Sequence, residues 1–277
     1  MTFKEKIQDR YNEIVEKPIM VTAIVLGFLG VVVMGVSLPF YISNPEEIFL
    51  NVLAEAHGML FDVFVIGILL YWLREKGEVR LRIRQYQDEI DDFRIWESEE
   101  AAFRNVGNIK RLNRHKVYTL NLVGCYMAKT NIGKVKLNNS NLNNANLSST
   151  ILIEADLSDC RLNQTLLENA NLNHANLKGA YASGAIFKDA FLIKSNFENA
   201  FLIKTDFRNA FLMEANLRGS ALAEANFEQA NLYKTDFRGA EGLTVEQLSK
   251  AKALYLAKFD PEIKAELLEK IPDLMGG

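Results

Sequence analysis

Residues 191–217 read FLIKSNFENAFLIKTDFRNAFLMEANL, and this five-residue rhythm runs without a skip from Leu122 to Phe237. Every fifth residue of that stretch is apolar, at 24 consecutive positions, and a small residue stands two positions before all but two of them. Asn or Asp often lies between the two, as in Ala145-Asn146-Leu147. A strand has a side-chain period of 2 and a helix of 3.6, so the pattern predicts a repeat architecture.

One large and one small residue per five can both point inward only if the chain turns a corner every five residues. Such a chain winds a coil that is narrow enough to be filled by those two side chains. The predicted core is therefore a stack of leucines and phenylalanines that is walled by small residues.

This pattern resembles the pentapeptide-repeat family, whose members are right-handed, four-sided β-helices with four pentapeptides per coil. The resemblance covers about 120 of the 277 residues. It implies an all-β quadrilateral solenoid of about six coils at residues 117–242, about 29 Å long at roughly 4.8 Å per coil. Each coil of such a rod contacts only its neighbours, so both ends need caps.

Composition and cysteine usage limit the classes of function. The net charge is -3 and 49% of the residues are hydrophobic, which gives no strong electrostatic signature for nucleic acid. Cys125 and Cys160 are the only cysteines and occupy small inward positions seven sides apart. We therefore expect two buried, unbridged thiols, which suit a reducing compartment.

The N-terminal part has the composition of a membrane segment. Residues 1–17 mix acids and bases and predict a short solvated helix on the cytoplasmic side. The 24 residues from Ile19 to Ile42 carry no charge, and a helix of that length is about 36 Å long, which exceeds a hydrocarbon core of roughly 30 Å. Residues 18–43 are predicted as transmembrane helix 1, because the run is too long for a cleaved signal peptide.

A second apolar stretch at 54–74 is predicted as transmembrane helix 2, with aromatic residues near its end. The loop between the two helices has no Lys or Arg, whereas five bases follow the second helix (Arg74, Lys76, Arg80, Arg82 and Arg84). Positive flanks stay inside. We therefore expect a two-helix, multi-pass protein of a bacterial-type inner (cytoplasmic) membrane, with both termini and the repeat domain in the cytoplasm.

Glu55 and Asp62 are candidate intramembrane polar residues. They are seven residues apart and so fall on one helical face. Ionisable residues within a span suggest a function by default, here a proton or ion path through an oligomer. The alternative is that Glu55 lies among headgroups while Asp62 is neutral or bonded to a partner helix.

Residues 75–108 are predicted as a charged cytoplasmic helix or linker that is ended by Gly107. Apolar residues recur along it at heptad spacing (Val79, Ile83, Tyr86, Ile90 and Phe93). Two heptads are short for an independent coiled coil, so this seam either mediates oligomerisation or packs on its own neighbours. Leu112 and Val117 continue the five-residue register upstream and are expected to cover the open first coil.

Residues 243–277 are predicted as a helical cap on the last coil. Thr244 and Gln247 have the spacing of a capping box. The helix that they begin is expected to present one apolar side (Val245, Leu248, Ala251, Tyr255 and Phe259). Asp260-Pro261 is a cap and first-turn pair for a further short helix.

Catalytic and metal-binding motifs are absent from the sequence. The three histidines are scattered, and no zinc-protease, paired-cysteine, serine-hydrolase or phosphate-loop motif occurs. We therefore expect no enzyme, no cofactor, no metal and no identifiable small-molecule substrate.

The outward residues of the coils suggest an interaction face. Under four repeats per coil, residues twenty apart lie on one side. One side carries large apolar residues (Ile151, Ile153, Phe191, Ile193, Phe211, Met213 and Tyr233), and the opposite side carries Tyr181, Phe201 and Ile203. Apolar patches of this kind mark interfaces, although the side chains can also pack on one another as a ladder. We predict that the first set is where the protein meets itself or a partner.

The sequence thus favours a membrane-anchored cytoplasmic scaffold for protein interaction or self-assembly, with the bilayer as a further partner. A first alternative is an oligomeric transport or membrane-sensing device built on Asp62. A second is protection of a topoisomerase by mimicry of DNA, the best-known activity of the family that the repeats resemble. The stretch 120–240 carries 12 bases and 11 acids, a net of +1, whereas a mimic of DNA needs a continuous negative surface.

Overall fold

The computed structural model describes residues 27–36 and 47–276. The chain divides between residues 82 and 83 into two compact units, which are treated separately below. The predicted segment 1–17 lies outside the described residues. Of predicted transmembrane helix 1, the structure describes only the helix Gly27–Val36, whose residues are mostly exposed.

Helix α3, Glu47–Asp92, is 46 residues long. Its part from Leu53 to Asp92 contains a window with a mean hydropathy of 1.8 and no buried residue, so by length and composition it could cross a membrane. The structure describes one helix of this kind, and the predicted transmembrane helix 2 lies inside it. No break separates that span from the charged residues after Leu73, because Pro is absent and the residues there are good helix formers.

Helix α4, Glu99–Arg114, follows a bend at residues 93–98. The prediction that Gly107 ends the helix is wrong: α4 runs through it, since one interior glycine destabilises a helix by only about 1 kcal/mol. The helical break occurs instead before Ser98, whose Oγ accepts a hydrogen bond from the backbone N–H of Ala101. That cap begins a new helix whose first turn is acidic, as the helix dipole favours.

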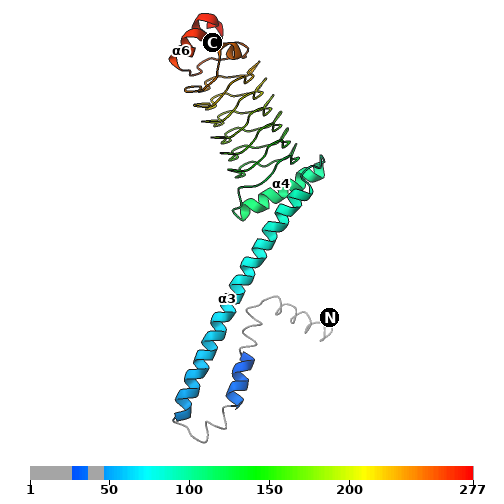
Figure 1. Cartoon of the computed structure of the whole chain (residues 1–277), viewed down its shortest axis with the longest axis vertical. Helices are drawn as coiled ribbons and strands as arrows, with labels where there is room; N and C mark the ends of the chain where they lie inside the picture. Colours follow the sequence, from blue (N-terminus) through cyan, green and yellow to red (C-terminus); the bar gives the residue numbers. More distant parts are fainter. Residues whose placement is uncertain (1–26, 37–46, 277) are drawn as a thin grey trace, which may run out of the picture. The chain divides into compact units, whose positions relative to one another are not determined.

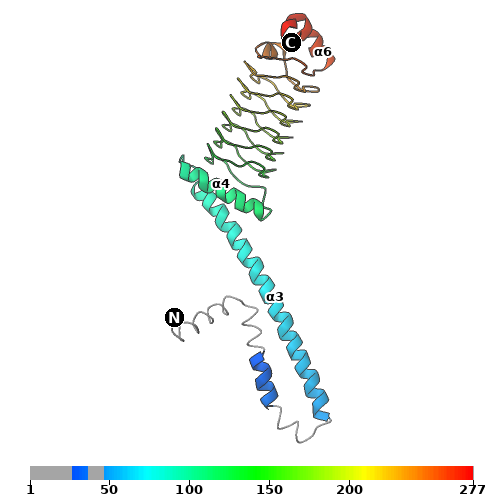
Figure 2. The same ribbon diagram turned by 180° about the vertical axis from the view of Figure 1, so that it is seen from behind.

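Helix α4 closes the first coil of the second unit (Figure 2). Ile109 and Leu112 are fully buried, as expected for Leu112, and Val117 packs against the same core. Asn113 both donates to the carbonyl of Lys136 (2.9 Å) and accepts from its N–H (2.7 Å). Ile83, Tyr86 and Ile90 of α3 also pack on this core. These members of the predicted heptad seam therefore contact their own unit.

The solenoid is built from single-residue parallel bridges, each joining residues twenty apart, from Asn121↔Asn141 to Ala221↔Glu241. Four five-residue repeats therefore make one coil, as the resemblance implied. Backbone bonds such as Leu122 N–H to Asn141 O (2.7 Å) connect successive coils. Among residues 117–242, no strand is longer than one residue, because a turn follows each bridge.

The turn in each repeat places one residue in the left-handed region, with φ between 55° at Asp159 and 71° at Gly239. Residues with a Cβ pay steric strain there, Asn and Asp least and β-branched residues most, whereas Gly pays none. The sequence follows this rule, since none of these left-handed positions within residues 117–242 is Val, Ile or Thr. Alternation of inward and left-handed positions thus fixes the corner after every fifth residue.

The core is filled as the repeat predicts. The fifth-position residues are almost fully buried, and phenylalanines stack from coil to coil, for example Phe187 on Phe207 (5.3 Å) and Phe207 on Phe227 (5.4 Å). Cys125 and Cys160 are free and buried, as expected. Burial raises the pKa of their thiols to about 11 and about 12.

The C-terminal segment contains helices α5 (Val245–Ser249), α6 (Pro261–Lys270) and α7 (Pro272–Gly276). The predicted capping box of Thr244 and Gln247 is confirmed. The long helix that was expected to follow it is wrong, because α5 has five residues and the chain then rejoins the solenoid.

The added partial coil pairs Ala253 with Asn231 and Lys258 with Asp236, a separation of 22 residues instead of 20. Leu254 and Phe259 are five residues apart and turn inward, so the repeat resumes after α5 with a two-residue offset. Helix α6 lies at this end of the solenoid (Figure 1). Its fully buried Leu267 packs on the core and completes the cover.

Candidate interaction face

The predicted interaction residues lie on one side of the solenoid, which we call the Phe191 face. Its bridge column contains Asn131, Ile151, Asn171, Phe191, Phe211 and Asn231, each paired with the next. The column beside it contains Gly133, Ile153, Asn173, Ile193, Met213 and Tyr233. The structure therefore brings all seven predicted residues to one wall.

The rings of Phe191 and Phe211 stack with centroids 5.1 Å apart and an angle of 6° between their planes. Phe191 still has 42% of its surface exposed, and Ile151 has 39%. The side chains thus stack on one another as a ladder, which was the predicted alternative to an interface. They still leave apolar surface in contact with water. Stacking orients the rings without burying them.

Tyr255 extends the Phe191 face at its C-terminal end, and sequence reasoning missed it. Its ring stacks on Tyr233 at 6.0 Å, and it is 41% exposed. The two-residue offset before Ala253 removes Tyr255 from the simple twenty-residue register. The five-residue spacing of Leu254 and Phe259 is the signal that could have revealed it.

Alternating charges line one edge of the Phe191 face. This edge column contains Lys134, Glu154, His174, Lys194, Glu214 and Lys234. Lys194 pairs with Glu214, and Lys134 with Glu154, each with 3.7 Å between Nζ and Oε2. Because these pairs are exposed, they add little to the free energy of folding. They are available to face charges on another molecule.

The opposite wall, which we call the Tyr181 face, carries the second predicted apolar set. Tyr181 stacks on Phe201 with centroids 4.7 Å apart and an angle of 3° between the ring planes. Both rings and Ile203 are exposed. This strip is shorter than that of the Phe191 face and offers a matched control surface.

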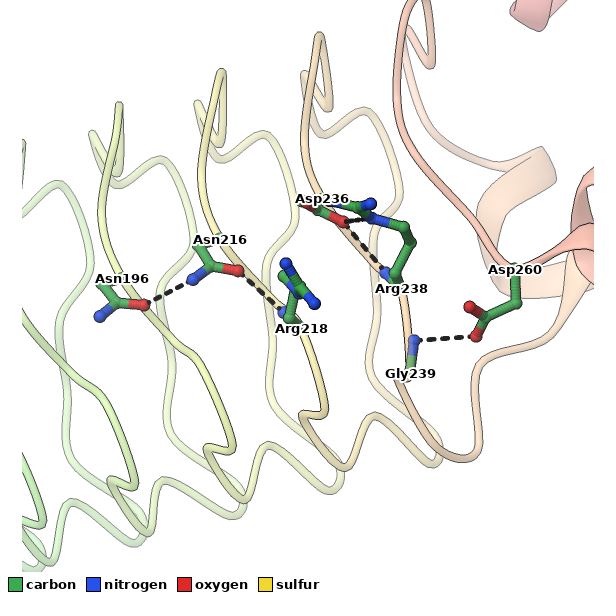
Figure 3. A network of polar contacts seen from close by, with 7 residues as sticks. All are labelled: Asn196, Asn216, Arg218, Asp236, Arg238, Gly239 and Asp260. Carbon is green, nitrogen blue, oxygen red and sulfur yellow. Dashed lines mark hydrogen bonds and ion pairs between the residues drawn. The ribbon is translucent and has the colours of Figure 1, made fainter.

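A third wall is polar and satisfies its own side chains. Asn216 donates from Nδ2 to Oδ1 of Asn196 (3.0 Å), Asn196 donates to Asn176 (3.2 Å), and Asn176 donates to Asp156 (3.1 Å). Figure 3 shows the pairing of Asn196 with Asn216 and the bond from Arg218 N–H to Asn216. The ladder ends at Asp156, because a carboxylate accepts hydrogen bonds but cannot pass one on.

Asp236 lies beyond the other end of this ladder and is held by Arg238. The guanidinium donates from Nε to Oδ1 (2.9 Å) and from Nη2 to Oδ2 (2.6 Å), and these bonds lower the pKa of Asp236. Burial alone would raise the pKa of Asp206, but its bonds from Arg208 lower it overall. Asp260 of the cap accepts from Gly239 N–H at 2.8 Å (Figure 3). These carboxylates have structural partners.

The candidate polar residues of the apolar span lie on α3. Glu55 and Asp62 are two turns apart on one side of the helix, and both are exposed. Among the residues that the structure describes, none forms an ion pair with either. His57 contacts the Leu53 carbonyl oxygen through Nδ1 at 2.6 Å. The same part of the chain contains no cluster of His, Cys, Asp and Glu that could hold a metal ion.

Comparison with known proteins agrees with the repeat. A model of the family described as pentapeptide repeats matches in eight copies, over residues 121–159, 150–189, 175–212 and 210–241. No protein of curated function matches this chain in sequence.

Several solved structures are similar to part of this chain. A pentapeptide repeat protein from the thylakoid lumen of Arabidopsis thaliana is 23% identical, over 38% of this chain and 66% of that one, with a TM-score of 0.32. HetL from the cyanobacterium Nostoc sp. strain PCC 7120, involved in heterocyst differentiation regulation, is 24% identical over 55% and 82%, with a TM-score of 0.24. QnrB1, a plasmid-mediated fluoroquinolone resistance protein, is 17% identical over 56% and 86%, with a TM-score of 0.31.

At these TM-scores the solved structures say nothing about what this chain binds. The copies matched by the family model coincide with the buried five-residue register and with the bridges between residues twenty apart. Residues 121–241 of this chain form a pentapeptide-repeat domain.

Proposed function

We propose that this chain is a non-enzymatic, membrane-anchored scaffold whose pentapeptide-repeat domain binds protein through the Phe191 face. The observation that carries the proposal is the strip of stacked but half-exposed apolar side chains across successive coils. Single exposed apolar residues are ordinary on a protein surface, whereas contiguous strips mark sites of interaction.

The rigidity of the solenoid favours binding through this face. Phe191 and Phe211 are both bridge residues, and their N–H groups donate to Ala170 and Ala190 carbonyls at 2.9 Å. The backbone beneath the rings is therefore fixed before a partner arrives. A preordered surface loses less conformational freedom on binding, so more of the apolar burial appears as affinity.

The anchor is proposed from the exposed surface of α3. Large apolar residues cover the helix between Leu53 and Leu73, and most of their side chains are exposed. Such a surface is stable in lipid, where apolar side chains need no cover. The bases from Arg74 onward support an anchor in a bacterial-type inner membrane with the repeat domain on its cytoplasmic side. The apolar helix Gly27–Val36 supports a second span.

A non-enzymatic role is supported by what the polar groups already do. Asp206 and Asp236 are held by arginines, and Asp156 ends the asparagine ladder. Cys125 and Cys160 have raised thiol pKa values and no exposure. Carboxylates with fixed partners and protonated, buried thiols are poorly placed to act on a substrate.

The test is to replace Phe191, Ile193, Phe211 and Met213 by Ser in the full chain within native membranes. We expect protein crosslinks from this face, identified by mass spectrometry, to fall at least about tenfold, which corresponds to about 1.4 kcal/mol of binding free energy. Circular dichroism would confirm that the coils persist. An unchanged crosslink pattern would contradict the proposal.

A matched control comes from the opposite wall. Serine at Tyr181, Phe201 and Ile203 removes a comparable stacked strip while leaving the Phe191 face intact. We expect the crosslinks of the Phe191 face to persist in this variant. Equal loss in both variants would mean that general surface hydrophobicity, and not this face, causes the association.

A further inference from the structure

The Phe191 face has a pattern that is symmetric about one point. Read along the rod, its bridge column is Ile151, Asn171, Phe191, Phe211, Asn231 and Ala253. From the midpoint between Phe191 and Phe211, phenylalanine mirrors phenylalanine, asparagine mirrors asparagine and an aliphatic residue mirrors an aliphatic residue. The column therefore reads alike in both directions.

The neighbouring column has the same centre. Ile193 and Met213 flank the midpoint, and Asn173 mirrors Tyr233 one coil further out. Ile153 mirrors Tyr255, which continues this column because Lys234 N–H donates to the Tyr255 carbonyl at 3.0 Å. Apolar positions thus face apolar positions at the centre, and the hydroxyl of Tyr233 faces an amide.

The two central charges on the edge of the face are complementary about the same centre. Lys194 lies on one side of the midpoint and Glu214 on the other, 3.7 Å apart, with 50% and 44% of their side chains exposed. A rotation by 180° about the midpoint exchanges a lysine for a glutamate. Lys194 of one copy would then lie opposite Glu214 of the other.

A closed two-fold interface requires this kind of self-complementarity, because residue i of one copy contacts j of the other and j contacts i. We propose that the Phe191 face binds a second copy of this chain in an antiparallel pair, with the two-fold axis between the Phe191 and Phe211 coils. Phe191 of each copy then packs against Phe211 of its mate, and Lys194 faces Glu214. This inference rests on the proposed function and names its partner.

The Tyr181 face lacks this property. About the midpoint of Tyr181 and Phe201, Lys204 mirrors Gly184, so the central position has no pair of unlike charges. Its bridge column also places Arg161 opposite Ala221. The mirrored bridge column with an unlike central charge pair therefore distinguishes the Phe191 face from the Tyr181 face, although both are built from the same repeat.

The first experiment uses two charge variants of the full chain in mild detergent. Lys194→Glu leaves two glutamates at the centre, and Glu214→Lys leaves two lysines. We expect each variant alone to self-associate about tenfold more weakly than the parent, because like charges then face each other twice. An equimolar mixture of the two variants is expected to regain the association. The exposed pair contributes little to folding, so both variants should fold.

The second experiment fixes the orientation with single introduced cysteines and a short bismaleimide. The native thiols are buried with raised pKa values, so introduced thiols react first. The antiparallel pair predicts a crosslink between Ile153→Cys and Tyr255→Cys chains when these are mixed. It predicts none between two Ile153→Cys chains, whose thiols would lie five coils apart, about 24 Å at roughly 4.8 Å per coil.

The outcomes separate this inference from the proposed function. A crosslink between two Ile153→Cys chains would overturn the antiparallel pair in favour of a parallel one. If the serine variant loses its crosslinks while both charge variants associate as the parent does, the face binds a different protein and this inference fails alone. If the serine variant is unchanged, the proposed function fails as well.

Discussion

The Phe191 face and the third wall, which carries Asn176, Asn196 and Asn216 and which we call the asparagine wall, are built on the same backbone. They have the same kind of bridges and turns and the same buried core beneath them. On the asparagine wall, side chains of successive coils satisfy one another through amide hydrogen bonds. On the Phe191 face they stack and remain half exposed. The backbone of the two walls is therefore alike, and their outward side chains decide whether a wall satisfies its own polar groups or leaves apolar surface available for binding.

We expect the largest effect from a substitution in the core that both walls share. Phe207 is fully buried and stacks between Phe187 and Phe227. We expect Phe207→Ala to lower the free energy of unfolding by about 3–5 kcal/mol, because the loss of apolar burial is joined by a cavity. Urea denaturation would measure it. A loss below about 1 kcal/mol would show that neighbouring coils collapse into the space.

A second experiment breaks the asparagine wall. Asn196→Ala removes the donor to Asn176, the acceptor for Asn216 and the acceptor for the N–H of Glu198 (3.1 Å). We expect a loss of about 1–3 kcal/mol in unfolding free energy, because part-buried neighbours lose their partners. Urea denaturation would measure this loss as well.

Phe191→Ala is the matching substitution on the Phe191 face. Phe191 is a bridge residue at the same place in its repeat as Asn196, but its side chain makes no hydrogen bond. We expect a smaller loss of stability, below about 1.5 kcal/mol, from the stacked ring. Its effect on association should be the larger one. If Phe191→Ala destabilises more than Asn196→Ala, the aromatic strip serves the fold and not a partner.

The smallest expected effect concerns pH. The bonds from Arg238 lower the pKa of Asp236 below its ordinary value of 3.8. A carboxyl whose folded pKa is depressed contributes stability above its unfolded pKa and loses it as pH falls through the folded pKa. We expect Arg238→Ala to reduce the unfolding free energy at pH 7 only slightly, and less than the substitutions above do, because solvent screens an exposed ion pair.

Below the folded pKa of Asp236 the parent and the variant should converge, because the carboxyl is then neutral in both. Chemical denaturation at pH 7 and at a pH well below 3.8 measures the difference. A difference that persists at the lower pH would mean that Arg238 acts by packing its side chain, and not through the charge of Asp236.

Much of the solenoid could be predicted because its local rules are strict. Leu122 and Phe237 belong to one unbroken period, and the resemblance to the pentapeptide-repeat family implied four repeats per coil, hence bridges between residues twenty apart. The apolar residues of the Phe191 face could be placed on one wall for the same reason. The break before Ser98, the continuation of α4 through Gly107 and the added coil at Leu254 were missed. Each depends on a competition between local signals that periodicity does not resolve.

The amino-acid sequence was enough to predict the five-residue corner and the buried column, because a repeat imposes one local geometry many times. The wall on which each outward residue lies followed once four repeats per coil were taken from the family resemblance. Only the tertiary structure decided how the coil ends are covered, where Tyr255 lies and which side chains satisfy one another. Those features arise from contacts between coils and caps, and their energies depend on neighbours that are remote in the sequence. The symmetry of the Phe191 face needed both, since its residues come from the repeat and its centre from the observed register.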